Sequence, residues 1–135
     1  MTDEEYVRSR WKYTHRIMSH VVEPGTHRIE VGEGGQNAKL IVKGAHSTTE
    51  AWHAAAEFTR ERERQIAEIR SEIDEVKEWV ESSRDMAIQA VGNGDAHIAG
   101  IGAAALFTEA RILGRLQSQL AELRRGMKEQ EGERE

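Results

Sequence analysis

The part of the sequence best suited to binding a ligand is the stretch from Gly92 to Ala105, GNGDAHIAGIGAAA. It holds four glycines and five alanines in fourteen residues. Each glycine lowers helix propensity by about 1 kcal/mol, so a helix that starts this way needs another source of stability. Two explanations stay open: another helix packs closely against these small residues, or the free N–H groups of the turn and helix start bind an anion such as phosphate.

Several side chains could complete an anion site. Arg111 and Arg115 lie one helical turn apart in the second predicted helix, and Arg28 lies on the exposed face of the predicted sheet. The planar guanidinium group suits two-point contacts with phosphate. Asn93 could position a phosphate or ribose, and Phe107 could stack on a base. The alternatives are arginines paired with surface glutamates and a phenylalanine that only packs.

Other kinds of chemistry find little support. The chain has no cysteine, which excludes disulfides, thiolate catalysis and cysteine-based zinc sites. Its six histidines include no i, i+4 pair on a helix, as a zincin-type metal site needs, and no serine stands in a nucleophile elbow. The carboxylates alternate with arginines in TRERERQIAEIRSEIDE, typical of a solvated helix face. We therefore expect no enzyme activity, metal or cofactor.

Composition limits the possible partners. The chain has 135 residues and a net charge of -5, with no basic face of the kind that binds duplex nucleic acid. Its N-terminus, MTDEEYVRSR, lacks the apolar core of a signal peptide. The longest weakly polar run, Ala96 to Phe107, is too short to span a bilayer. We expect a soluble cytoplasmic protein that does not enter a membrane.

The first third of the chain reads as an antiparallel sheet. Alternating polar and apolar residues predict strands over Trp11–Ile17 and Thr26–Val31, separated by a turn at Pro24-Gly25. After a glycine-rich loop, a third strand runs over Ala38–Val42. Three strands joined by short turns predict a β-meander within residues 9–44.

Two long helices follow. Ser47 and Glu50 fit a capping box at the start of a helix over residues 47–91. Gly92 to Asp95 ends this helix, and Asp95 can cap a second helix over residues 95–127. Each helix carries an apolar seam at spacings of three and four. The seam residues are Ile66, Ile69, Ile73, Val76 and Val80 in the first helix, and Leu113, Leu116, Leu120, Leu123 and Met127 in the second.

The predicted fold is therefore α+β, a three-stranded meander followed by an antiparallel hairpin of two long helices. We expect a single domain over residues 1–135, with flexible ends at 1–8 and 128–135. Trp52, Phe58, Trp79 and Phe107 add apolar surface that one hairpin cannot cover. A second copy is the simplest cover, so we expect a homo-oligomer. Phe58 is the alternative to Phe107 as a base-stacking ring.

A short sheet followed by TTEAWHAAAEFTRERERQIAEI and a second long helix resembles small early proteins of bacteriophages. Among those with known roles, the architecture is similar to the Thoeris anti-defence proteins. These are small oligomers that sequester cyclic ADP-ribose isomers, and some also hold cyclic oligonucleotides. That family uses arginines from the sheet and second helix, an asparagine near the inter-helix turn and an aromatic ring. Arg28, Asn93 and Arg111 stand in comparable places.

Three functions remain open at this point. The first, implied by the resemblance and the arginines, is sequestration of a cyclic nucleotide immune signal in the host cytoplasm, without turnover. The predicted ligand-binding residues are Arg28, Asn93, Phe107, Arg111 and Arg115. The second is an inhibitor or adaptor that binds a host protein through the helical hairpin. The third is a structural coiled-coil protein without a ligand.

Overall fold

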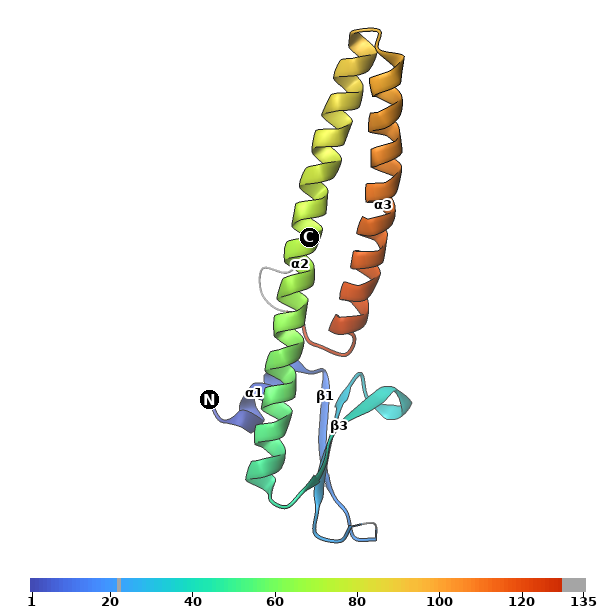
Figure 1. The fold of residues 1–135 in the computed structure, drawn as a ribbon. Coiled ribbons are helices and arrows are strands. Elements are labelled where there is room, and N and C mark those ends of the chain that lie inside the picture. The colour runs from blue at the N-terminus through green and yellow to red at the C-terminus, as the bar shows by residue number, and fades with distance from the viewer. Residues whose placement is uncertain (22, 130–135) are drawn as a thin grey trace. The chain divides into compact units, whose positions relative to one another are not determined.

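The computed structural model describes residues 1–21 and 23–129, which group into two compact units (Figure 1). Unit 1 contains the described residues up to Arg64 together with residues 124–129, and unit 2 is Gln65–Leu123. Unit 2 is thus inserted into the sequence of unit 1. Most of the predicted flexible tail, residues 130–135, lies outside the described residues.

The sheet of unit 1 confirms the predicted meander. Strands β1 (Tyr13–Met18), β2 (His27–Gly32) and β3 (Ala38–Ala45) pair antiparallel in the order β1-β2-β3, and a short 3₁₀ turn, η1 (Gly35–Asn37), precedes β3. On β2 the side chains His27, Ile29 and Val31, which alternate with Arg28 and Glu30 in the sequence, are buried. The central strand therefore has the alternation that a half-buried strand requires.

The N-terminus is not the flexible segment that we expected for residues 1–8. Helix α1 spans Asp3–Arg10, and the Thr2 hydroxyl caps it by accepting the Glu5 backbone N–H at 3.1 Å. Its Val7 side chain is fully buried. The eight-residue helix is polar on most sides, so its stability comes from packing one apolar side chain into unit 1 rather than from its own periodicity.

Trp11 does not begin the first strand, as its place in the alternating pattern suggested. It caps the end of α1 and is buried, and its indole Nε1–H donates to the Thr59 hydroxyl at 3.0 Å. Its ring centroid lies 6.4 Å from that of Phe58. The strand begins at Tyr13 instead, because the packing of the Trp11 side chain against Phe58 and Thr59 fixes the backbone that precedes Tyr13.

The chain returns to unit 1 after the second long helix. Gly126 has a φ of 79°, and a Cβ built there would lie 2.5 Å from Gly32 Cα, so only glycine fits this backbone contact. The Gly126 carbonyl accepts the Lys12 N–H at 2.8 Å, and Met127 bridges to Trp11. The prediction that Met127 belongs to the helix seam is wrong, because the helix ends before Gly126.

Helix α2 spans Thr48–Gly92, close to the predicted bounds. Its start has the predicted cap: the Ser47 hydroxyl accepts the Glu50 N–H at 3.0 Å. The Glu50 carboxylate accepts the backbone N–H of His46, also at 3.0 Å, one residue earlier than in a standard capping box. Both contacts satisfy N–H groups at the helix start.

Unit 2 is the predicted antiparallel hairpin of α2 and α3 (Ala96–Arg124). Ile73, Val76 and Leu116 are buried between the helices. Ile69, Val80, Ile112, Leu113 and Leu120 pack around them. We call the contact line between the two helices the seam. It also holds one polar pair, in which the Ser83 hydroxyl donates to the Glu109 carboxylate at 2.9 Å.

Among the described residues, one helix is long and apolar enough, by length and composition alone, to cross a membrane. This helix is α3, whose most apolar window has a mean hydropathy of 1.2 and is 6% buried. The expectation that no segment is long enough overlooked this helix, because the weakly polar run does not stop at Phe107. It continues to Leu113, interrupted only by Thr108, Glu109 and Arg111.

Candidate ligand pocket on the second long helix

A pocket of about 310 Å³ lies on the outer surface of α3 and is lined by Thr108, Arg111, Ile112 and Arg115. The spacing of three and four residues places these side chains on neighbouring turns of one helix face. The two guanidinium groups are exposed and the Ile112 side chain forms part of the apolar wall. The pocket therefore combines two fixed positive charges with an apolar surface.

Within the described residues, neither Arg111 nor Arg115 pairs with a carboxylate. Arg111 lies over the ring of Phe107, with its Cζ 6.0 Å from the ring centroid. Phe107 is 68% exposed, so it is not an interior packing residue of this chain. The structure therefore brings together three of the five predicted site residues: Phe107, Arg111 and Arg115.

The glycine-rich turn lies apart from this pocket. By helix geometry, Arg111 stands about 22 Å along α3 from its first residue, Ala96. The turn uses its own polar groups: the Asn93 N–H donates to Gln89 O at 3.0 Å, and the Asp95 carboxylate accepts the Ile98 N–H at 3.0 Å. Because Asp95 puts a negative charge at the helix start, an anion gains little there.

The small residues of α3 instead allow a close approach of the helices. A Cβ built on Gly102 would lie 2.8 Å from the Ala87 Cβ, whereas one built on Gly100 meets nothing within 4 Å. Gly102 is buried and Gly100 is exposed. Of the two explanations for the glycine-rich stretch, helix packing is the one that accounts for Gly102.

Arg28 and Phe58 both belong to unit 1. Arg28 is exposed on β2, opposite Ile17 of β1. Phe58 is half-buried against Trp11, with the charged groups of Lys39 and Arg62 over its ring. Phe58 therefore serves as a packing residue, while a ligand role for Arg28 stays a prediction.

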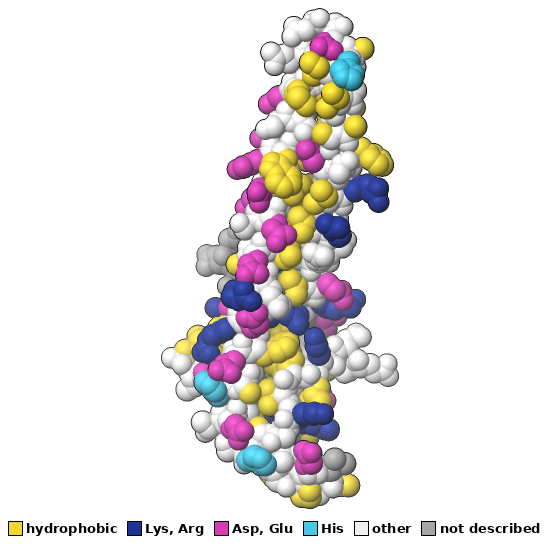
Figure 2. Space-filling view, viewed as in Figure 1, with side chains coloured by type: hydrophobic (Ala, Val, Ile, Leu, Met, Phe, Trp, Pro, Cys, Tyr) yellow, Lys and Arg dark blue, Asp and Glu magenta, His cyan; other side chains and the backbone are white. Residues whose placement is uncertain are grey.

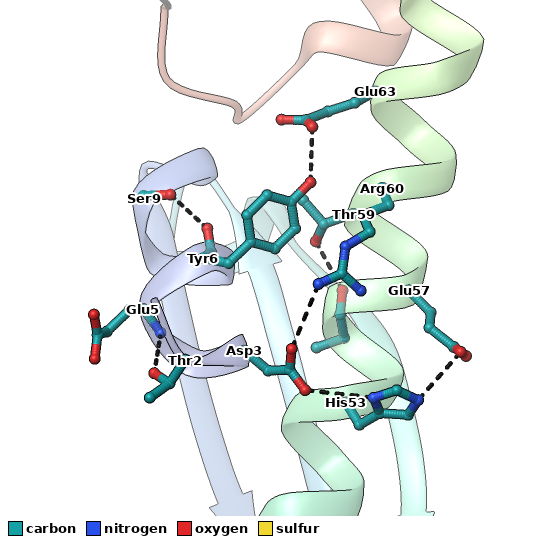
Figure 3. A network of polar contacts seen from close by, with 11 residues as sticks. Thr2, Asp3, Glu5, Tyr6, Ser9, His53, Glu57, Thr59, Arg60 and Glu63 are labelled. Carbon is teal, nitrogen blue, oxygen red and sulfur yellow. Dashed lines mark hydrogen bonds and ion pairs between the residues drawn. The ribbon is translucent and has the colours of Figure 1, made fainter.

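Unit 1 contains a polar network that sequence reasoning missed (Figure 3). The Tyr6 hydroxyl donates to the Glu63 carboxylate at 2.7 Å, and His53 and Arg60 approach Asp3. Burial raises the pKa of Tyr6 to about 12, and the hydrogen bond to Glu63 adds to this shift. The network joins α1 to α2, and no group of three potential metal ligands occurs among the described residues.

Unit 2 leaves large apolar side chains exposed. They are Trp79, Met86, Ile88 and Val91 of α2, and Ile98, Ile101 and Phe107 of α3. Figure 2 shows a hydrophobic strip running along the hairpin, with mostly acidic side chains on the α2 edge and basic side chains on the α3 edge. The sequence singled out Trp79 and Phe107, but not this arrangement of charge around them.

Comparison of the chain with protein-family models, curated proteins and solved structures gives no match.

Proposed function

We propose that this chain binds a phosphate-bearing nucleotide, of the cyclic immune-signal type, in the α3 pocket and holds it without turnover. The observation that carries the proposal is the pair of guanidinium groups, Arg111 and Arg115, around one pocket and without carboxylate partners among the described residues. An arginine pair free of acidic partners is suited to bidentate phosphate contacts.

The size of the pocket fits part of a nucleotide. Its 310 Å³ lies at the small end of the range of ligand sites, which is about 300–1,000 Å³. A phosphate with a ribose or a base fits there, and Phe107 beside Arg111 offers an exposed aromatic ring.

The lining also suits binding more than catalysis. The described lining residues are two arginines, an isoleucine and a threonine, whose hydroxyl donates to Ala104 O at 3.2 Å. Arginine keeps its proton at neutral pH, so none of these side chains is a ready general base. We therefore propose sequestration, as in the phage proteins that the architecture resembles.

The test is calorimetry of the purified protein against cyclic ADP-ribose isomers and cyclic di- and trinucleotides, with mass spectrometry of any small molecule released by heating. We expect Arg111→Ala to weaken binding roughly ten- to a hundred-fold, since a charge-assisted hydrogen bond contributes about 1.5–3 kcal/mol. Arg115→Ala should act in the same direction, and Arg28→Ala tests whether the sheet contributes.

Arg84→Ala is the matched control. Arg84 is an exposed arginine of α2 that follows the seam residue Ser83, so its removal changes the net charge equally outside the pocket. Equal binding by the wild type, Arg111→Ala and Arg115→Ala would place the ligand elsewhere. No heat with any nucleotide, and no nucleotide released on heating, would exclude the proposed function.

A second candidate is supported by a separate observation. The apolar side chains exposed on unit 2 are suited to contact with another protein. An inhibitor or adaptor that docks on a host protein would use this surface and needs no ligand in the arginine pocket. In that case Trp79→Ala should abolish its action in the host, while Arg111→Ala should not.

A further inference from the structure

One face of unit 2 joins the exposed tryptophan to the arginine pocket. The exposed α2 residues Glu72, Glu75, Trp79 and Met86 each stand one position before a residue of the seam. So do the exposed α3 residues Ile101, Thr108 and Arg115, and the half-buried Ile112, which also packs at the edge of the seam. Because the helices are antiparallel, positions before the seam on both helices lie on the same face of the hairpin. We call these eight residues the front face.

The front face is large enough for a stable interface. The two helices of unit 2 each contribute about 28 residues, or about 40 Å of length, and together are about 20 Å wide. A face of that size offers about 800 Å², the contribution of one partner to a standard interface. It would bury Trp79, Met86 and Ile101, which are 46%, 40% and 52% exposed.

Trp79 and the arginine pocket lie at the same level of the hairpin. The hydrogen bond between Ser83 and Glu109 fixes which residues of the helices are level with each other. In antiparallel helices, a residue four positions before Ser83 is level with a residue four positions after Glu109. Trp79 is therefore level with the middle of the segment from Arg111 to Arg115. Glu75 lies one helical turn below Trp79, close to the level of Arg115.

The charges of the front face select one way of pairing two copies. Glu72 and Glu75 lie on its α2 side, and Arg115 lies on its α3 side, with Arg111 beside it in the pocket. A two-fold axis parallel to the hairpin leaves the position of each residue along the helices unchanged, and it places α2 of one copy against α3 of the other. Acidic groups then face arginines. A two-fold axis across the hairpin would instead place α2 of one copy against α2 of the other, so that the glutamates would not face the arginines.

We propose that a second copy of this chain covers the front face, with the two-fold axis parallel to the hairpin, so that Trp79 of each copy packs on the arginine pocket of its partner. Glu75 of each copy then faces Arg115 of its partner, and four helices form a bundle. Trp79 meets the two guanidinium groups, which bind well to the face of an indole ring. Both copies make the same contacts, as a two-fold interface requires.

This dimer has a consequence for the ligand site that rests on the proposed function. In one copy the pocket is open, and its aromatic neighbour is Phe107 on the same helix. When a ligand binds, its base can stack on the Trp79 ring of the partner in place of the guanidinium groups that the ring contacts in the empty dimer. The complete ligand site then contains residues from both copies.

The charges of the front face also argue against a membrane as its cover. Burying Glu72, Glu75 and Arg115 in lipid is unfavourable, since each charge loses its hydration without gaining a partner. A second copy provides partners for these groups. A membrane is therefore the alternative outcome of the test.

The test begins with protein freed of small molecules, whose mass is followed by light scattering over a range of concentrations. We expect a dimer for the wild type and a dissociation constant about a hundredfold higher, or more, for Trp79→Ala, because a buried tryptophan is a frequent hot spot. Trp11 and Trp52 are buried. Quenching by acrylamide therefore reports mainly on Trp79, and it should decrease as the dimer forms.

A charge exchange tests the orientation. Glu75→Arg and Arg115→Glu should each raise the dissociation constant about tenfold, because each dimer contains the pair twice. Combining both substitutions should restore the dimer. Lys77→Glu, which follows the seam residue Val76 and lies on the opposite face, is the control. All these residues are exposed, so circular dichroism should show unchanged helix content.

Three results would overturn the proposal. They are a monomeric wild type, a dimer that Trp79→Ala does not affect, and a charge exchange that fails to restore assembly. A monomer that sediments with vesicles of phosphatidylcholine and phosphatidylglycerol, unless Trp79 is replaced, would overturn it in favour of a membrane. A dimer that binds no nucleotide would contradict only the proposed function, and a monomer that binds nucleotide would contradict only the dimer.

Discussion

The tryptophans of the two units differ in their exposure to solvent. In unit 1, Trp11 and Trp52 are 3% and 4% exposed, and the Nε1–H of Trp11 has a hydrogen-bond partner in Thr59. In unit 2, Trp79 is 46% exposed and Phe107 is 68% exposed. Unit 1 covers its aromatic side chains with its own helices and sheet, while the two helices of unit 2 cover only the seam.

This contrast separates stability from recognition. A sheet with helices packed on it has an interior that one copy can close, whereas two helices can bury only one narrow stripe each. Large apolar residues outside that stripe lower the solubility of a single copy. Their presence indicates a surface that another surface covers. We therefore expect substitutions in unit 1 to act on folding and those on the outer faces of unit 2 to act on binding.

The largest expected effect is the difference between the two tryptophans when each is replaced by alanine. Trp11→Ala should lower the free energy of unfolding by about 3–5 kcal/mol, since it leaves a cavity and removes the partner of Thr59. Trp79→Ala should change the stability of the single copy by less than about 0.5 kcal/mol. Urea unfolding at low protein concentration, followed by circular dichroism, measures both.

Equal losses of stability for the two variants would contradict the contrast between the units. It would mean that Trp79 is buried within one copy in solution.

A smaller effect is expected from two glycines within unit 2. Gly102→Leu should cost about 1–3 kcal/mol or more, because the new side chain meets Ala87 in the packed seam. Gly100→Ala should instead stabilise the hairpin by up to about 1 kcal/mol, since the site is open and alanine favours a helix. Thermal unfolding distinguishes the two. Unchanged stability in Gly102→Leu would show that the helices do not approach closely there.

The smallest effect concerns the polar network of unit 1. The pKa of Tyr6 is raised to about 12 in the folded protein, while an unfolded tyrosine titrates near 10. Between these values the unfolded state loses the proton and the folded state keeps it, so stability falls as pH rises from 10 to 12. Tyr6→Phe should cost about 1 kcal/mol at neutral pH and remove this part of the alkaline loss.

Chemical unfolding at pH 8, 10 and 11 compares the wild type with Tyr6→Phe. Tyr13→Phe, on β1 and outside the network, is the matched control. A wild type and a Tyr6→Phe variant that lose stability in parallel above pH 10 would show that Tyr6 does not contribute.

The sequence predicted those elements whose pattern repeats. The seam of α2 and α3 follows spacings of three and four over several turns, and β2 alternates strictly, so both were found. Helix α1 was missed because a polar eight-residue segment has no such signal and depends on burying Val7. Trp11 was assigned to a strand because alternation alone cannot show that a preceding helix determines its place.

The candidate site was predictable only where its residues share one helix. Arg111, Arg115 and Phe107 are four residues apart in sequence, so a helix places them together. Asn93 was wrongly grouped with them. A helix rises about 1.5 Å per residue, so the many residues between the turn and Arg111 place the turn far from the arginines. That Trp79 lies level with the pocket depends on the register of two antiparallel helices. The sequence of one helix alone does not determine this register.

The contact of Gly126 with Gly32 has a consequence for the order of folding. The hairpin of α2 and α3 needs only residues that are close in sequence, so it can form early. The contacts of Lys12 and Trp11 with Gly126 and Met127 join parts of the chain separated by more than a hundred residues. During synthesis, which proceeds from the N-terminus, these contacts of unit 1 can form only after Gly126 and Met127 have left the ribosome.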